Sequence, residues 1–120
     1  MDDALEGLDV WRRSRFMAVQ IFKLFANCRD YGFKDQVTRA AVSIPSNIAE
    51  GFERNSTKEF INYLRIARGP CAELRTQLYI GEEINYIEFQ AAKSLQQEAL
   101  EISKMLQGLI NHYKSRQRIS

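Results

Sequence analysis

The chain has 120 residues, of which 45% are hydrophobic and 27% charged, and its formal net charge is +2. This length allows one core, and the composition excludes a disordered chain, which would be less hydrophobic and more highly charged. No apolar run approaches the roughly 20 residues of a membrane span, and the acidic start Met1-Asp2-Asp3 does not fit a signal peptide. We therefore expect one cytoplasmic domain over residues 1–120, with no membrane contact.

The first helical pattern begins at Val10. Its small and apolar residues recur at alternating steps of four and three, which places them on one face of a helix. They are Val10, Ser14, Met17, Ile21, Leu24 and Cys28. Between residues 16 and 28 the apolar positions fill an arc of roughly 220°, whereas a core-facing stripe needs only about 100°.

This wide apolar arc has two interpretations. The helix is either the most central one of the fold, or its additional apolar surface meets another subunit. Phe16 falls within the polar strip of the helix, and the other aromatic residues form a second row beside the first stripe. The residues that we place on an expected oligomer interface are Trp11, Phe16, Phe22 and Phe25.

The second and third helical patterns each contain a proline. The second runs from about 35 to 50, and Gly51 is placed to end it in a left-handed conformation. The third begins at a capping box formed by Ser56 and Glu59 and continues to Leu78. We expect Pro45 and Pro70 to kink these helices, with a break into two short helices as the alternative at Pro45.

The fourth helical pattern follows a turn around Asn85 and extends from Leu95 to Tyr113. All the connections are short, as antiparallel neighbouring helices require. The sequence therefore predicts an all-α fold, an antiparallel up-and-down four-helix bundle.

The surplus of positive charge lies in a basic C-terminal tail at about 112–120. Such a tail is either a solvated end, whose cations suit the C-terminal pole of a helix, or a phosphate contact. Three arginines spaced by three and seven residues share one side of the third helix, and they form either a solvated face or a phosphate-binding strip. The candidate nucleic-acid-binding residues are Arg65, Arg68, Arg75, Lys114, Arg116 and Arg118.

Catalytic motifs are missing from the sequence. His112 is the only histidine, and the chain has neither a Glu-x-x-His pair nor a Gly-rich phosphate loop. Cys28 and Cys71 stand alone in their segments, which favours buried thiols over a disulfide or a metal site. We expect a protein that is not an enzyme and that carries no metal or cofactor.

One segment carries a family resemblance. Its sequence is Ser43-Ile44-Pro45-Ser46-Asn47-Ile48-Ala49-Glu50-Gly51-Phe52, and Ser56 and Glu59-Phe60 follow it. It resembles the signature of the bacterial four-helix-bundle family named after the 23S rRNA intervening-sequence protein. The resemblance covers about residues 8–87 and fades in the fourth helix. The family usually has Ser at position 70, a larger apolar residue at 71 and an acidic one at 75, where this chain has Pro70, Cys71 and Arg75.

The signature residues are Ser43, Pro45, Ser46, Asn47, Glu50 and Gly51. Two interpretations apply to them. In the structural one, Asn47 bonds across helices, Glu50 lies near the positive N-terminus opened by Ser56, and Gly51 turns the chain. In the other, the polar members of the signature form a binding surface.

The resemblance implies a bundle that assembles as a ring of five, in a family without an established enzymatic activity. It also implies a fold similar to the accessory proteins of diversity-generating retroelements, which are basic pentamers that bind nucleic acid and a reverse transcriptase. This chain is less basic than those proteins. We therefore expect a homo-oligomeric scaffold or adaptor whose partner is itself, with an RNA-binding accessory protein as the alternative, and with RNA or another protein as the further partner.

Overall fold

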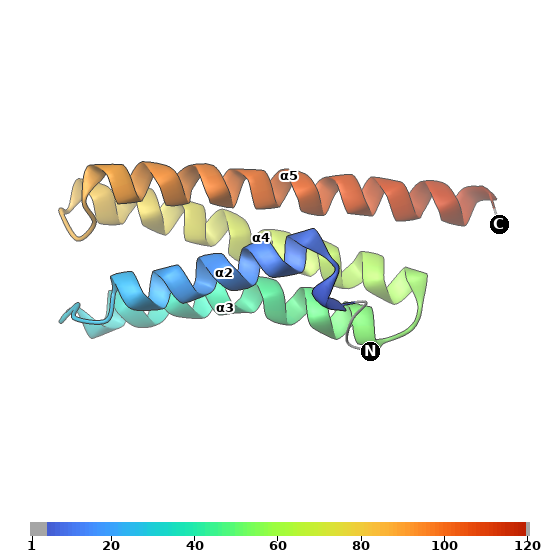
Figure 1. The fold of residues 1–120 in the computed structure, drawn as a ribbon, viewed down its shortest axis with the longest axis horizontal. Helices are drawn as coiled ribbons and strands as arrows, with labels where there is room; N and C mark the ends of the chain where they lie inside the picture. Colours follow the sequence, from blue (N-terminus) through green and yellow to red (C-terminus); the bar gives the residue numbers. More distant parts are fainter. Residues whose placement is uncertain (1–4, 120) are drawn as a thin grey trace.

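Four long helices make up most of the computed structural model, which describes residues 5–119 and the side chains of residues 5–117. They are α2 (Asp9–Leu24), α3 (Tyr31–Glu53), α4 (Thr57–Glu83) and α5 (Phe89–Ile119). The chain reverses direction at each connection (Figure 1), and each helix packs against the next, while α2 also packs against α5. The predicted four-helix bundle is confirmed. Within the described residues, no helix has the length and apolar character needed to cross a membrane.

The core is built from the inward stripes of all four helices. Met17, Ile44, Leu74 and Ile102 are among the fully buried side chains, and each lies on a stripe that the sequence predicts. The end of the first stripe is different. Leu24 is 39% exposed, and Phe25, four residues after Ile21, takes the inward position, with its ring centroid 5.8 Å from that of Phe33.

The connection between α3 and α4 differs from the predicted one. Helix α3 continues to Glu53, so Gly51 lies inside it and does not adopt the left-handed conformation that we expected. Asn55 takes that conformation instead, with a φ of 55°. Asparagine tolerates this region better than most residues because its short side chain can hydrogen-bond locally. Ser56 then caps α4, since its hydroxyl accepts from the Glu59 amide at 3.3 Å.

Both prolines lie within continuous helices. Pro45 is inside α3 and Pro70 is inside α4, and neither helix divides there. The alternative of two short helices at Pro45 is therefore wrong.

The longest helix is α5, with 31 residues. The basic segment that the sequence predicts as a tail is helical as far as Ile119, and Figure 1 shows this end of α5 reaching beyond the other helices. Near the point where it leaves the bundle, the ring of Tyr113 packs on Phe60 with a centroid distance of 5.3 Å.

Candidate interaction surfaces

The outer face of α2 carries large apolar side chains. Phe16 is 63% exposed and Phe22 is 48% exposed, and the half-exposed Val19 lies between them along the chain. We call these three residues the α2 patch. Of the four predicted interface residues, Phe16 and Phe22 are thus at the surface, and Trp11 is half-buried. The prediction for Phe25 is wrong, because this side chain is 1% exposed and belongs to the core of its own bundle.

Positive charges surround the α2 patch. Arg12 pairs with Asp9 and donates to the Glu6 carbonyl at 2.7 Å. The guanidinium of Arg15 lies 4.7 Å from the ring centroid of Trp11, and Lys23 is exposed at the end of the helix. The patch is therefore an apolar surface bordered by the cations Arg15 and Lys23, while Asp9 neutralises the charge of Arg12.

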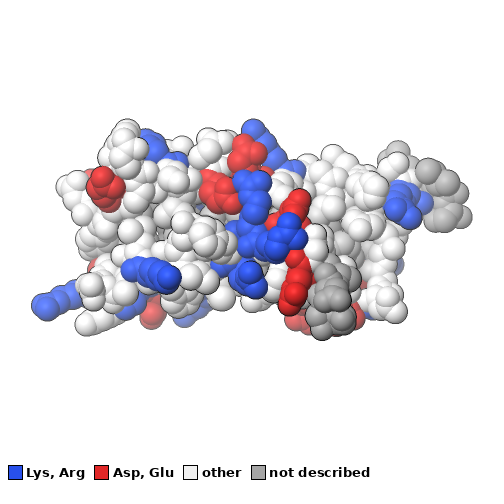
Figure 2. Space-filling model, in the orientation of Figure 1, with Lys and Arg blue, Asp and Glu red and all other residues white. Residues whose placement is uncertain are grey.

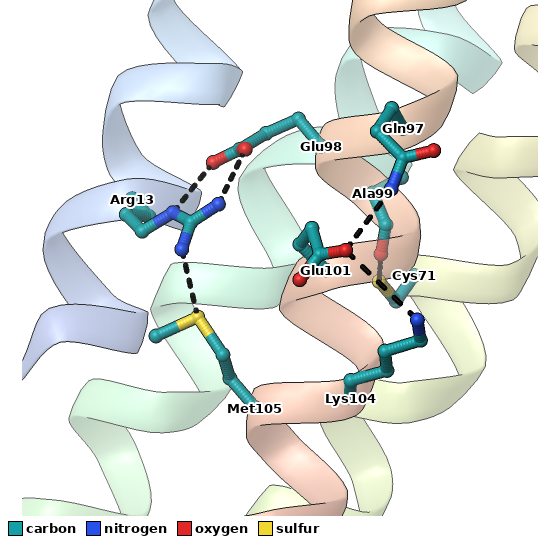
Figure 3. A network of polar contacts seen from close by, with 8 residues as sticks. All are labelled: Arg13, Cys71, Gln97, Glu98, Ala99, Glu101, Lys104 and Met105. Carbon is teal, nitrogen blue, oxygen red and sulfur yellow. Dashed lines mark hydrogen bonds and ion pairs between the residues drawn. The ribbon is translucent and has the colours of Figure 1, made fainter.

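A polar network joins α2 to α5 (Figure 3). Arg13 donates from two nitrogens to the two carboxylate oxygens of Glu98, at 2.9 and 2.7 Å, and a third nitrogen lies 3.5 Å from Met105 Sδ. This bidentate contact raises the pKa of Arg13 above its ordinary value. Such planar pairing fixes geometry as well as charge, so the network holds the two helices in register.

The same face has charges of both signs. Lys104 lies 3.9 Å from a carboxylate oxygen of Glu101, which also accepts from Gln97 at 3.0 Å. Figure 2 shows Lys and Arg side chains interleaved with Asp and Glu near the middle of the α2–α5 face. A phosphate-binding surface needs cations gathered without such neutralising partners, and this face does not offer them.

The polar signature residues Asn47 and Glu50 bond mainly within their own helix. Asn47 donates to the Ser43 carbonyl at 2.8 Å and to its hydroxyl at 3.0 Å, so it bonds within its own helix and not across helices as we expected. Glu50 pairs at 3.0 Å with Arg54, and it does so in place of the contact that we expected with the start of α4. Arg54 in turn donates to the Tyr63 hydroxyl at 2.7 Å, which links the end of α3 to α4.

Gly51 is the tightest point of the signature. A Cβ atom at this position would lie 2.5 Å from Tyr63 Cβ, far inside van der Waals contact. The glycine thus allows α3 and α4 to approach closely. Pro45, six residues earlier in α3, is also buried. Ser46 is exposed, and no contact in the structure explains its place in the signature.

The predicted arginine strip lies on α4. Arg65 and Arg68 are exposed, Arg75 is half-buried, and none of the three forms an ion pair with another described residue. The exposed Lys114 and Arg116 belong to the last turns of α5, while the side chain of Arg118 lies outside the described residues. Since Tyr113 packs on Phe60, Lys114 lies near the N-terminal end of α4, which also carries Arg65.

The thiols and the histidine are separate from one another. Cys71 is buried and donates to the Ala99 carbonyl at 3.1 Å, and its burial raises its pKa to about 11. Cys28 is half-buried, and His112 is exposed with its ring beside Tyr113. Among the residues that the structure describes, no group of His, Cys, Asp and Glu could hold a metal ion.

A second outward stripe lies on α4, and the sequence analysis did not identify it. Ile66 and Ile80 are each 45% exposed, and Gly69, Glu73 and Thr76 lie between them on the exposed side. The steps from 66 to 69, 73, 76 and 80 alternate between three and four. This is the same helical signal that marks the core stripe, but it is less apolar and is shifted to the opposite side of the helix.

Comparisons with known proteins agree with this architecture. A family model described as 23S rRNA-intervening sequence protein matches residues 6–108. A crystal structure of a protein of unknown function from the S23 ribosomal protein family of Bacteroides thetaiotaomicron is 30% identical in sequence, with a TM-score of 0.78. The match covers 84% of this chain and 97% of that one. A search of curated proteins gave no match. The chain, with its α3 signature and its four-helix bundle, belongs to the 23S rRNA-intervening sequence protein family.

Proposed function

We propose that this protein is a non-enzymatic bundle that assembles with copies of itself and acts as an oligomeric scaffold or adaptor. The observation that carries the proposal is the α2 patch, which leaves two aromatic rings of one helix largely in water. Fully burying a side chain of this size stabilises a protein by about 1.5–3 kcal/mol. Aromatic residues are enriched at protein interfaces for this reason.

The absence of a catalytic role is part of the proposal, and the arrangement of the polar groups supports it. A hollow of about 640 Å³ lies between the start of α2 and the later half of α5, and its one carboxylate, Asp9, is paired with Arg12. General acid–base catalysis needs a titratable group positioned against a substrate, usually with a shifted pKa. The strongly shifted thiol, Cys71, is buried in the core and held protonated.

A ring of five subunits is the specific form that we propose, on the basis of the family resemblance. Closed rings use heterologous contacts, in which one surface of a subunit meets a different surface of the next. A scaffold of this kind repeats every surface feature once per subunit, so a weak individual site gains avidity.

The mass of the wild-type particle in solution tests this proposal. We expect light scattering on a sizing column to give about five times the mass of the single chain at micromolar concentration, because association buries the α2 patch. On dilution, the mass of the particle should fall only at concentrations well below the micromolar range. A particle with the mass of one chain at micromolar concentration would rule out self-assembly.

RNA binding is the second candidate function, and the arginine strip of α4 favours it. Arg65 and Arg68 are exposed and Arg75 is half-buried, and no described carboxylate forms an ion pair with any of the three. Lys114 extends the same end of the bundle. Unpaired cations of this kind are what a phosphate backbone would neutralise.

A salt titration with a structured RNA tests the second candidate. If the strip binds phosphate, the double substitution Arg65→Gln with Arg68→Gln should weaken binding and make its salt dependence shallower. Each lost contact removes about 0.7 from the logarithmic slope on single strands and about 0.9 on duplex. Ending the chain at Asn111 should have a similar effect.

The matched control removes two exposed cations elsewhere, Arg29→Gln with Arg39→Gln. It has the same net charge as the strip variant, so a decrease in affinity common to both would indicate nonspecific attraction. Wild-type protein that fails to bind even at low salt, where electrostatic attraction is strongest, would exclude RNA binding.

A further inference from the structure

We propose that the side of the bundle along the contact between α4 and α5 binds the backbone of duplex RNA. This inference rests on the RNA-binding candidate, and it names both the ligand and the surface that receives it. We call this surface the α4–α5 surface, and we assign to it Arg68, Arg75, Ser103, Gln107 and Lys114.

The positive charge of the chain is concentrated in two segments, residues 60–72 of α4 and residues 102–119 of α5. Together they contain six of the 17 Lys and Arg residues and none of the 15 Asp and Glu residues. The rest of the chain therefore has a formal charge of −4, although the whole chain has +2. Antiparallel packing brings the two segments together, since the ring centroids of Phe60 and Tyr113 are 5.3 Å apart.

The rotation of α4 shows which of its cations lie beside α5. Glu82 of α4 accepts from Gln96 of α5 at 2.9 Å, so this contact pair marks the sides that the two helices turn toward each other. Arg75 and Arg68 precede Glu82 by seven and fourteen residues. At about 100° per residue, they lie within about 40° of it around the helix. Both arginines are therefore on the flank of α4 that adjoins α5.

The facing flank of α5 carries neutral and charged polar groups. Ser103, Gln107 and Lys114 follow the α5 member of the contact pair by 7, 11 and 18 residues. They therefore lie within about 20° of its side of the helix. Ser103 and Gln107 are half-buried and Lys114 is exposed. The α4–α5 surface thus has arginines on one helix and a lysine with two neutral polar groups on the other.

The carboxylates nearest to this surface in the sequence point away from it. Glu73 lies about 180° from Glu82 around α4, and Glu101 lies about 140° from Gln96 around α5. Glu82 itself is paired with Lys93 at 3.2 Å. No described carboxylate forms an ion pair with any of the three cations of the α4–α5 surface. Cations gathered in this way are what a phosphate backbone neutralises.

The α4–α5 surface offers no apolar anchor among its described residues. In residues 60–72 and 102–117, Ile66 is the only exposed large hydrophobic residue, and His112 is also exposed. Each is sixteen residues from its member of the contact pair, and thus about 160° away around its helix. Single strands are held largely by bases stacked on aromatic rings, and protein partners by aromatic or apolar anchors. A duplex needs neither, because its bases are already stacked inside.

The neutral groups of the surface favour RNA over DNA. The wide minor groove of an RNA duplex presents 2′-hydroxyl groups beside the phosphates, and proteins recognise duplex RNA mostly through these two groups. The hydroxyl of Ser103 and the amide of Gln107 can both donate and accept, as a 2′-hydroxyl does. Gln107 also donates to Asn111 at 2.9 Å, which orders its amide at the surface.

Charge changes at Gln107 test this assignment with a fully paired RNA stem as the probe. Gln107→Lys should add one phosphate contact, which steepens the logarithmic salt slope by about 0.9 and strengthens binding roughly eightfold at about 0.1 M salt. Gln107→Glu should weaken binding and make the slope shallower, because its carboxylate offsets one cation. Both variants should keep the wild-type mass and helicity, and a gain in affinity cannot result from misfolding.

The matched control makes the same two changes at Gln90, an exposed residue of α5 that lies about 120° from Gln96 around the helix. Gln90→Lys and Gln90→Glu have the same net charges as the Gln107 variants, and they should bind the stem as the wild type does. Gln107 variants that bind like the wild type would overturn the site. Gln90 variants that change the affinity as much as the Gln107 variants would overturn it as well.

Three further ligands, compared at one salt concentration, identify the kind of partner. The RNA stem should bind more tightly than polyuridine of the same length, a DNA duplex of the same sequence, or polyglutamate. Equal or tighter binding of polyuridine would overturn the duplex, of the DNA duplex would overturn RNA, and of polyglutamate would point to an acidic protein. A wild type that binds no nucleic acid even at low salt would instead overturn the RNA-binding candidate itself, so the failures are distinguishable.

Discussion

Replacing Gly51 with alanine should destabilise the protein by about 2 kcal/mol, even though alanine is the better helix former. The added Cβ would lie 2.5 Å from Tyr63 Cβ and 3.3 Å from a ring carbon of Phe60, whereas carbon atoms pack best at about 3.5–4.0 Å. The Cβ of Tyr63 cannot move by a side-chain rotation, so α3 and α4 must separate. Overpacking of this kind costs typically 1–3 kcal/mol, and it outweighs the gain in helix propensity of at most about 1 kcal/mol.

Gly108→Ala is the control for this experiment. Gly108 is also inside a helix, but an added Cβ meets nothing within 4 Å. Thermal unfolding of this variant, followed by circular dichroism at one fixed protein concentration, should show no loss and a gain of up to about 1 kcal/mol. Equal stability of the Gly51 and Gly108 variants would show that the α3–α4 contact at Gly51 is not a tight one.

The fold could be predicted from the sequence because its signal is repeated many times. Each helix contributes several inward positions at steps of three and four, so one misplaced residue does not change the pattern. The errors occur where a single residue decides the geometry. Leu24 and Phe25 follow Ile21 by three and four residues, so both fit helical spacing, but Phe25 is buried and Leu24 is 39% exposed. Spacing within one helix does not decide which of two such neighbours faces the other helices.

Gly51 is a second residue whose structural role could not be predicted from the helical pattern. A glycine near the end of a helical pattern often terminates the helix, and the next residues, Phe52 and Glu53, do not contradict that prediction. Its actual role depends on Tyr63, twelve residues later in a different helix. Close approach between helices is a three-dimensional property, so one sequence gives no signal for it.

The candidate surfaces were only partly predictable. The wide apolar arc of the first helix identified Phe22, and Phe16 was identified because it is an aromatic residue within the polar strip of that helix. The second outward stripe of α4 was missed, since Gly69, Glu73 and Thr76 are ordinary residues for a solvated helix side and only their place between two exposed isoleucines makes them notable. Exposure is decided by the packing of the neighbouring helices, which a single helix pattern does not contain.

Phe16→Glu should dissociate the assembled protein and leave each bundle folded. Phe16 is 63% exposed in the protomer, so the substitution removes little from the core. At a subunit contact, losing the buried aromatic ring weakens association by about 2 kcal/mol. The buried carboxylate without hydrogen-bond partners weakens it by about 1–3 kcal/mol more. At 1.4 kcal/mol for each factor of ten, the dissociation constant should rise roughly 100-fold to 4,000-fold. Sedimentation velocity over a dilution series measures this shift.

Tyr31→Glu is the matched control, because Tyr31 is 67% exposed and lies at the start of α3, outside the α2 patch. It exchanges an equally exposed aromatic ring for the same carboxylate, and the negative charge suits the N-terminal pole of the helix. This variant should sediment as the wild type does. Far-UV circular dichroism should show wild-type helicity for both variants, because neither side chain belongs to the core. If Phe16→Glu sediments like Tyr31→Glu, the α2 patch does not form the subunit contact, whatever the mass of the wild-type particle.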